Sequence, residues 1–146
     1  MTPDDFGIYN FRRLSPTLTT SGQPDEAQFA ALRDAGVAAV INLALVDSPR
    51  ALADEPGTLA ALGLRYTHIP VDFKAPTEGD FQAFAATMDA LGDTPAHVHC
   101  AANWRVSAFL YRYRTERLGW DEAAARPDLE ALWQPDAVWR NFLHWD

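Results

Sequence analysis

Three short apolar runs alternate with longer segments of helical periodicity, and this alternation constrains the fold more than any other feature. The runs cover residues 37–43, 65–71 and 96–100, and in the segments that follow, apolar residues recur every three or four positions. Buried strands that alternate with helices are typical of a sheet covered on both faces. The sequence therefore predicts an α/β fold with a central, mostly parallel sheet flanked by helices.

Capping residues and glycines mark the ends of the expected helices. Pro24 begins a helix that stops at Gly36, and Thr77 is a suitable N-cap for a helix with Phe81, Phe84, Met88 and Leu91 on one face. A helix over 51–62 is interrupted by Pro56 and Gly57, and two more helices are expected at about 121–132 and 136–142. The tryptophans there, Trp133, Trp139 and Trp145, are expected to pack against the body of the protein.

Size and charge narrow the class of protein. A chain of 146 residues fits one domain. A net charge of −8 argues against electrostatic binding to nucleic acid or anionic lipid. The one cysteine permits no internal disulfide, the first residues do not resemble a leader peptide, and no apolar run is long enough for a membrane span. These features predict a cytoplasmic protein that does not act at membranes.

The single cysteine lies where a strand gives way to a helix. Strand 96–100 ends at Cys100, and Val106, Phe109, Leu110 and Tyr113 mark one face of the helix that follows. A thiol at a helix N-terminus is pushed toward the thiolate, and Arg105 offers a fork of donors that fits a tetrahedral oxyanion. The pair indicates nucleophilic attack on phosphorus or a related centre. The alternative is a small buried cysteine beside a solvated arginine.

The residues around Cys100 resemble the signature of the cysteine-dependent protein tyrosine and dual-specificity phosphatases. His99-Cys100, the short loop, Arg105 and Ser107 carry this likeness, and three further segments resemble small bacterial dual-specificity-like phosphatases, including those attached to β-lactamase-type hydrolase domains: Ser21-Gly22-Gln23-Pro24, Ile41-Asn42-Leu43 and Ile69-Pro70-Val71-Asp72. The resemblance implies a single phosphatase-like domain over residues 1–146. It also implies a cysteinyl-phosphate intermediate and no metal or organic cofactor.

The resemblance assigns roles to three residues. Cys100 is the expected nucleophile, Arg105 the phosphate clamp and Asp72 the general acid that protonates the leaving oxygen. Asp80 competes with Asp72 for the last role, but it falls at a helix start, where an acid often only favours the helix dipole.

Six other residues are expected to form the phosphate-binding site. His99 would orient the loop through hydrogen bonds, and Ser107 would donate to the thiolate and help it leave. The remaining four lie between the cysteine and the arginine, namely Ala101, Ala102, Asn103 and Trp104.

The loop departs from the family pattern by one residue. The family has five residues between Cys and Arg and a Ser or Thr directly after the Arg, whereas here four residues separate Cys100 from Arg105 and Val106 precedes Ser107. In an ungapped register Val106 takes the arginine position and Asn103 the usual glycine position. Asn is the best substitute for Gly in a left-handed conformation, which favours that register. Phosphatase activity is therefore expected to be weak, altered or absent.

Two other functions fit the same residues. A shorter Cys-to-Arg loop also occurs in rhodanese-like sulfurtransferases, and a catalytically impaired module would bind a phosphate without turning it over. The phosphorylated substrate, protein or small molecule, and the oligomeric state are left open. An acidic stretch of Asp47, Asp54 and Glu55 lacks the spacing of a calcium loop and is expected to be a solvated helix face. No metal site is predicted.

Overall fold

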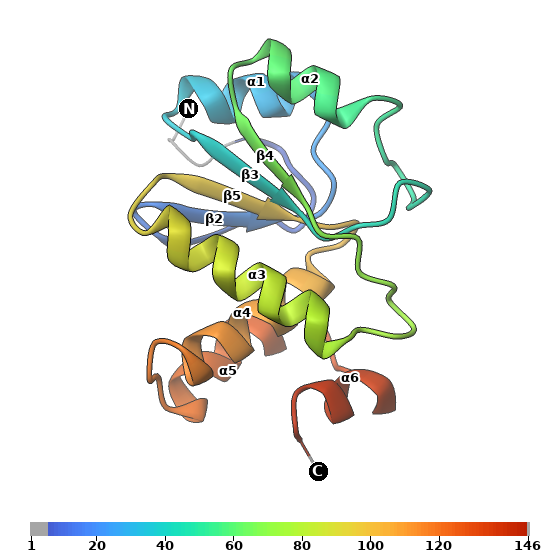
Figure 1. Ribbon diagram of the computed structural model, residues 1–146, viewed down its shortest axis with the longest axis vertical. Helices are drawn as coiled ribbons and strands as arrows, with labels where there is room; N and C mark the ends of the chain where they lie inside the picture. The colour runs from blue at the N-terminus through green and yellow to red at the C-terminus, as the bar shows by residue number, and fades with distance from the viewer. Residues whose placement is uncertain (1–5, 146) are drawn as a thin grey trace.

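A computed structural model describes residues 6–145 as five strands and six helices in a three-layer arrangement (Figure 1). The strands are β1 (Arg12–Ser15), β2 (Leu18–Ser21), β3 (Ala39–Asn42), β4 (Arg65–His68) and β5 (Ala96–His99). The helices are α1 (Glu26–Asp34), α2 (Glu55–Ala61), α3 (Glu78–Leu91), α4 (Trp104–Glu116), α5 (Glu122–Glu130) and α6 (Ala137–Phe142).

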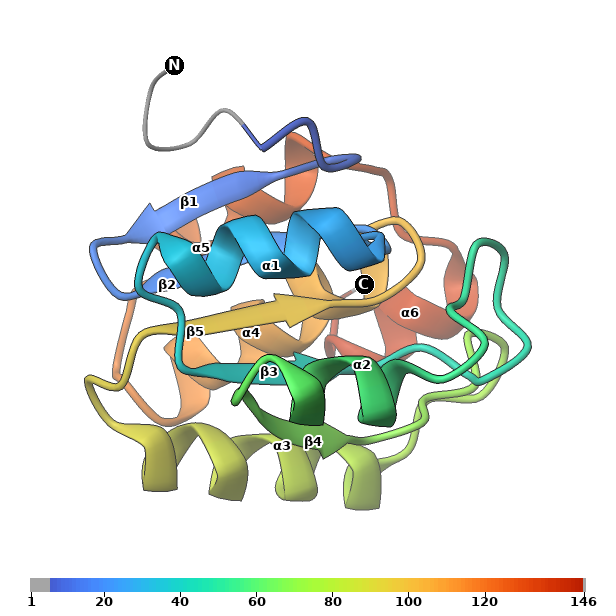
Figure 2. The ribbon, with the colours of Figure 1, turned by 90° about the horizontal axis from the view of Figure 1, so that it is seen from above.

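The strands form one sheet in the order β1-β2-β5-β3-β4, with β5 at its centre (Figure 2). The pairs β2/β5, β5/β3 and β3/β4 are parallel, and only the edge strand β1 is antiparallel to its neighbour. The predicted α/β fold with a mostly parallel sheet is confirmed. Because parallel strands end at one edge, the segments after β2, β3, β4 and β5 gather there.

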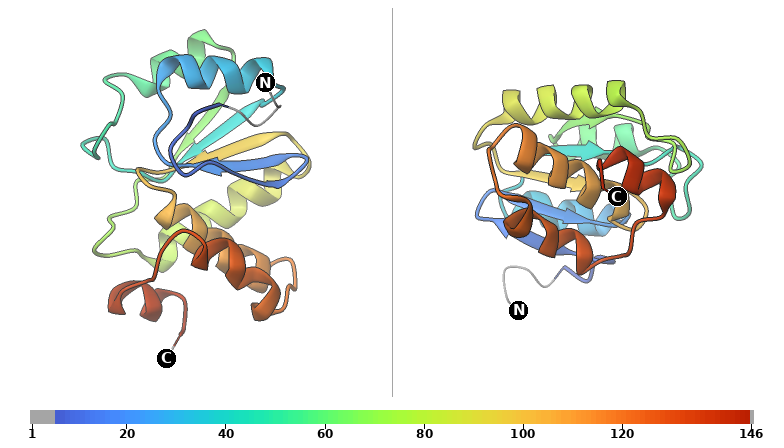
Figure 3. Two further views of the ribbon diagram at one scale, coloured as in Figure 1. Left: turned by 180° about the vertical axis from the view of Figure 1, so that it is seen from behind. Right: turned by 90° about the horizontal axis from the view of Figure 1, so that it is seen from below.

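Helices cover both faces of the sheet. Helices α1 and α2 lie on one face, and α3, α4, α5 and α6 lie on the other (Figures 1 and 3). The larger apolar cluster joins β3 and β5 to α3 and α4 and is rich in aromatic rings, including Trp139, which is fully buried. The smaller cluster packs Phe29 and Leu32 of α1 against Val40 and Leu59. The tryptophans near the C-terminus pack as predicted.

Capping residues set the helix starts. Thr77 caps α3 as predicted and forms a reciprocal capping box with Asp80, and Asp25 and Gln28 do the same for α1. Pro56 stands in the first turn of α2, where a proline needs no hydrogen-bond partner, so the helix begins at Glu55 instead of being broken in its middle. Pro56 and Gly57, which were predicted to interrupt a helix over 51–62, therefore lie in the first turn of α2.

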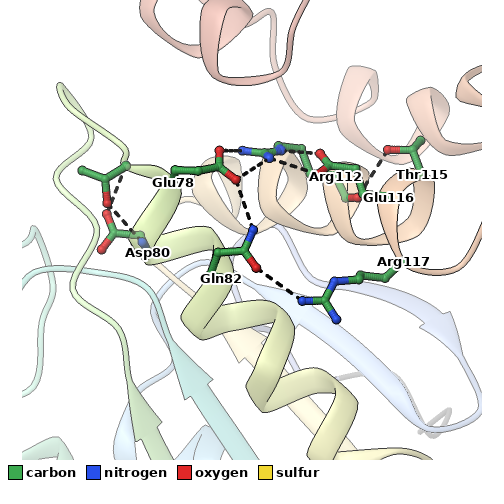
Figure 4. Close-up of polar contacts among 8 residues, drawn as sticks. Glu78, Asp80, Gln82, Arg112, Thr115, Glu116 and Arg117 are labelled. Atoms are coloured by element: carbon green, nitrogen blue, oxygen red, sulfur yellow. Dashed lines mark hydrogen bonds and ion pairs between the residues drawn. The ribbon is translucent and has the colours of Figure 1, made fainter.

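Arg112 fastens α3 to α4. Its guanidinium donates to both carboxylate oxygens of Glu78 on α3, at 2.8 and 2.9 Å, and binds Glu116 one turn further along α4 (Figure 4). It also lies 4.0 Å from the ring centre of Phe81 and 4.7 Å from that of Phe142. The Arg112 side chain is nearly inaccessible to solvent, whereas Glu78 and Glu116 are exposed, so water still screens these ion pairs in part.

Strands β1 and β2 are absent from the sequence expectations, and the observed strands are shorter than predicted. In β2 the buried residues are polar: Thr19, Thr20 and Ser21. Buried His97 explains Thr19 and Ser21, because its two ring nitrogens lie 2.8 Å from Thr19 Oγ1 and 2.7 Å from Ser21 Oγ. Thr20 Oγ1 accepts a hydrogen bond from Asn103 Nδ2 at 3.0 Å. A strand stabilised by such contacts lacks the apolar signal on which the prediction depends.

Candidate active site

Cys100 occupies the junction between the central strand and helix α4. It directly follows β5, its side chain belongs to the larger apolar cluster, and only 1% of the residue is exposed. Three residues later, Asn103 adopts a left-handed conformation with φ 68° and ψ 6°, and α4 begins at Trp104. The N–H groups of the first helical turn have no acceptor within the helix and carry the positive end of its dipole. Residues 100–105, here called the Cys loop, thus have the backbone of an anion site.

The N-terminal part of the chain holds the Cys loop in place. Asn10 Nδ2 donates to Ala102 O at 2.9 Å, and Asn103 Nδ2 donates to Asn10 O at 2.9 Å and to Thr20 Oγ1 at 3.0 Å. Gln23 N donates to Ala101 O at 3.1 Å. Hydrogen bonds from a segment about 80 to 90 residues earlier in the chain therefore hold the loop in place.

Gly22 permits this close approach. It forms a bridge with Ala102, and a Cβ at this position would lie 2.6 Å from Ala101 O and 2.9 Å from the Tyr9 ring. No side chain fits there without moving the backbone of the Cys loop. The glycine of the Ser-Gly-Gln-Pro segment is explained by this contact.

Arg105, the last residue of the Cys loop, reaches the segment that carries Asp72. Its Nη1 donates to Val71 O at 2.9 Å, its guanidinium lies 5.9 Å from the centre of the Phe73 ring, and the residue is 6% exposed. Within residues 6–145, Val71 O is the one acceptor that this guanidinium is found to bind. A guanidinium has five N–H donors, so most of its capacity is left for a ligand.

Val106 takes no part in polar contacts and is fully buried in the larger apolar cluster. The left-handed conformation predicted for Asn103 is confirmed, and the ungapped register depends on this conformation. The assignment of the arginine position to Val106 stays a prediction.

The two candidate acids differ in what their carboxylates do. Asp72 is exposed, and its Oδ1 accepts a bond from Lys74 N at 2.9 Å, within the segment 69–77 that we call the Asp loop. In contrast, Asp80 Oδ2 accepts from Thr77 N in the capping box of α3 (Figure 4). The structure thus brings Asp72 next to the residue that Arg105 binds, and it gives Asp80 a structural role.

His99 is fully buried on the opposite face of β5 from Cys100. Its Nδ1 lies 3.2 Å from Cys100 O, and its Nε2 lies 2.7 Å from Glu55 Oε2. Gln23 Nε2 donates to the other carboxylate oxygen of Glu55 at 2.9 Å. Burial raises the pKa of Glu55, but the hydrogen bond and charge of His99, with bonds from Gln23 and Tyr66, outweigh it and lower the pKa below its ordinary value of 4.5.

The expectation of a solvated acidic face is wrong for Glu55, which is only 5% exposed. Its backbone starts α2 and aims the side chain inward at His99, a partner 44 positions later in the sequence. The role of Glu55 was missed in the sequence analysis because the neighbouring acidic residues indicated a solvent-exposed helix face. His99 belongs to the expected buried strand 96–100, and a buried histidine needs a polar partner, so this residue was the one signal that pointed to an acid.

Ser107 has partners other than the predicted thiolate. Its hydroxyl donates to Trp104 O at 2.7 Å and accepts from Trp133 Nε1 at 2.9 Å. Trp104, 36% exposed, stacks on Trp133 with ring centres 5.1 Å apart and an angle of 2° between the planes. In this arrangement the serine holds the stacked rings of Trp104 and Trp133. Together with Phe73, which contacts both, they form what we call the aromatic wall beside the loop.

Within residues 6–145, no group of three or more His, Cys, Asp or Glu side chains is arranged to hold a metal ion. In the same range, no helix has the length and apolar character that a bilayer span requires.

Comparisons with known proteins agree with this geometry. Residues 12–134 match the family described as PTP-NADK, a DSP-PTPase phosphatase fused to NAD+ kinase. A β-lactamase hydrolase-like protein of Agrobacterium fabrum is 32% identical over 102 residues, which are 64% of this chain and 22% of that protein. The chain thus spans about a fifth of the length of that curated relative.

Solved structures show the same fold. A Shewanella putrefaciens CN-32 protein assigned to the phosphatases (DUF442) is 35% identical with a TM-score of 0.83, covering 94% of this chain and 91% of that one. Pseudomonas aeruginosa TpbA, solved in complex with pTyr, is 22% identical with a TM-score of 0.70, covering 97% and 84%. By the extent of the family match and the shared fold, this chain belongs to the DSP-PTPase family of small cysteine-dependent, dual-specificity-like phosphatases.

Proposed function

We propose that this protein hydrolyses a phosphate monoester through a cysteinyl-phosphate intermediate on Cys100. The observation that carries the proposal is the position of Cys100 in front of the α4 N-terminus, with Arg105 bound to the carbonyl that precedes Asp72. A nucleophile, an anion-binding backbone, a cation and a carboxyl group thereby meet at one edge of the sheet. The family match favours phosphoryl transfer over sulfur transfer.

The reaction has two steps. The Cys100 thiolate attacks phosphorus, the ester P–O bond breaks, and Asp72 gives its proton to the leaving oxygen. A water molecule then attacks phosphorus while Asp72 takes its proton, the P–S bond breaks, and the thiolate and inorganic phosphate are released. The first-turn N–H groups of α4 and Arg105 stabilise the charge on the phosphoryl oxygens in both steps.

The aromatic wall supports an aryl phosphate as the first substrate to test. Trp104 lies within the Cys loop, and Phe73 follows Asp72 with its ring centre 6.0 Å from that of Trp104. A phosphate carried on a flat ring gains apolar contact and stacking beside these rings. Both a phosphorylated protein and a small molecule can present such a ring.

A second function, phosphate binding with little turnover, is favoured by Val106. The valine stands where the family has its arginine and is fully buried, so the loop lacks that cation at its usual position. Arg105 also has to share its donors with Val71 O. We therefore expect slow turnover relative to family members that have the full motif.

Trapping of the intermediate distinguishes the two functions. Rapid mixing with an aryl phosphate followed by acid quench is expected to leave one phosphoryl group on Cys100, detected as a mass increase that is absent in Cys100→Ser. Protection of Cys100 from alkylation by inorganic phosphate, without any phosphoryl adduct or released phosphate, would support binding alone. If the protein showed no phosphoryl adduct and phosphate gave Cys100 no protection from alkylation, both functions would be contradicted.

A further inference from the structure

His99 contacts two groups that accept hydrogen bonds. Cys100 O, 3.2 Å from Nδ1, is a carbonyl oxygen and can only accept. Glu55 Oε2, 2.7 Å from Nε2, also accepts when the carboxyl group is ionised. A neutral imidazole has one N–H, so it cannot donate to both. Two donated bonds require the imidazolium form.

The surroundings of the pair favour the ionised carboxylate. Gln23 Nε2 donates to Glu55 Oε1, and a donated hydrogen bond favours the ionised carboxylate. His97, whose ring centre lies 6.5 Å from that of His99, is held between two hydroxyl groups, and burial lowers its pKa well below 6.5. His97 is therefore neutral. The other neighbours are the uncharged Phe29 ring on α1 and the Tyr66 hydroxyl near Glu55.

The peptide between Cys100 and Ala101 links this pair to the thiol. Its C=O points at His99, and because the peptide is trans, its N–H points the opposite way. His99 contacts Phe29 on the α1 face, whereas the Cys100 side chain packs on the α3/α4 face. The Ala101 N–H is thus directed to the face on which the thiol lies. A charged donor on the carbonyl polarises the peptide and strengthens that N–H as a donor to an anion.

We propose that Glu55 is a positioning residue that keeps His99 doubly protonated, so that an imidazolium polarises the Cys100–Ala101 peptide and favours the thiolate of Cys100. Only the catalytic consequence of this inference depends on the proposed function, because a favoured thiolate matters for turnover only if Cys100 is the nucleophile. The charge state of His99 is a property of the resting protein. It can be measured without any substrate.

Nitrogen NMR of the histidine rings provides the first test. At pH 7 the unmodified protein is expected to show N–H protons on both ring nitrogens of His99, with the signal assigned by its loss in His99→Asn. A single ring proton on His99 would mean a neutral His99 with a protonated Glu55, and this would overturn the proposal. The measurement needs no variant of Glu55 and so does not depend on such a variant folding.

Replacement of Glu55 provides the second test. In Glu55→Gln the amide can donate to Nε2, which leaves the neutral ring with its proton on Nδ1 and keeps the bond to Cys100 O. We expect the midpoint of the Cys100 alkylation rate against pH to rise by about one pH unit, a tenfold fall in the ratio of thiolate to thiol. Asp54→Asn is the matched control, because it removes a charge from the neighbouring exposed residue and keeps a good N-cap.

The outcomes separate this inference from the proposed function. An equal midpoint in Glu55→Gln and Asp54→Asn would overturn the role of Glu55 even in an active phosphatase. Conversely, a doubly protonated His99 and a raised midpoint in Glu55→Gln would support it even if no phosphate ester is hydrolysed.

Discussion

The Cys loop and the Asp loop meet at the same edge of the sheet but are held in different ways. Every residue from Ala101 to Asn103 is bonded to the segment between Asn10 and Gln23, far away in the sequence. The carboxylate of Asp72 is exposed, and within residues 6–145 the one donor that it is found to bind is Lys74 N, two residues away. The backbone of the Cys loop is thus fixed before any ligand binds, whereas the carboxylate that we propose as the proton donor is free to reorient toward a substrate.

The largest expected effect concerns the Asp loop. Asp72→Asn should lower kcat about 10²–10⁴-fold on alkyl phosphates, which need a proton on the leaving oxygen, and less on activated aryl phosphates. The melting temperature should change little because Asp72 is exposed. Phosphate release assays with both substrate types measure the difference.

Asp80→Asn is the control for that assignment. It weakens the capping box of α3 and should cost about 1 kcal/mol of unfolding free energy, with turnover nearly unchanged. A larger loss of turnover in Asp80→Asn than in Asp72→Asn would show that Asp80 is the acid.

The next effect concerns the contact between the two loops. Arg105→Ala removes the guanidinium that binds Val71 O and should weaken the protection of Cys100 by phosphate or tungstate roughly 10–100-fold, the loss expected for one charged hydrogen-bonding group. Arg105→Lys should restore part of it, since a lysine keeps the charge but not the fork of donors. Undiminished protection in Arg105→Ala would mean that Arg105 serves only to hold the Asp loop.

A smaller effect tests how tightly the Cys loop is built. Gly22→Ala should lower the unfolding free energy by about 1–3 kcal/mol, because the new Cβ meets Ala101 O and the Tyr9 ring. Gly79→Ala, in the first turn of α3 with 3.8 Å to its nearest neighbour, should leave stability unchanged or raise it by up to about 1 kcal/mol. Denaturant unfolding of the two variants measures the contrast, and equal stability would contradict the tight packing at Gly22.

The smallest effect is a loss of stability in mild acid. His97 has a pKa well below 6.5 in the folded protein, so below pH 6.5 the unfolded chain binds more protons and stability falls by up to about 1.4 kcal/mol per pH unit. The lowered pKa of Glu55 adds a further loss as the pH falls below 4.5. In His97→Asn, the fall in stability between pH 6.5 and pH 5 should disappear from the unfolding curves, and an unchanged fall would assign it to another group.

The sequence allowed the sheet, the position of Cys100 and the conformation of Asn103 to be predicted, because each depends on local patterns: an apolar run, a strand-to-helix change and the conformational preference of Asn. It did not reveal β2 or Glu55. Both depend on polar groups that become acceptable inside the protein only through partners distant in the chain, His97 for β2 and His99 for Glu55. Such pairings leave no periodic signal. The acid and clamp roles of Asp72 and Arg105 stay predictions.

The reciprocal bonds between Asn10 and the Cys loop also affect how the protein acquires its site. They join residues 92 and 93 positions apart, so they form only after the chain has closed a loop over more than half its length. Contacts of such sequence separation are slow to form. Strand β5, helix α4 and Cys100 can therefore be in place before the Cys loop has its final conformation. During refolding, the ability to bind phosphate should appear after most of the helical circular dichroism signal has returned.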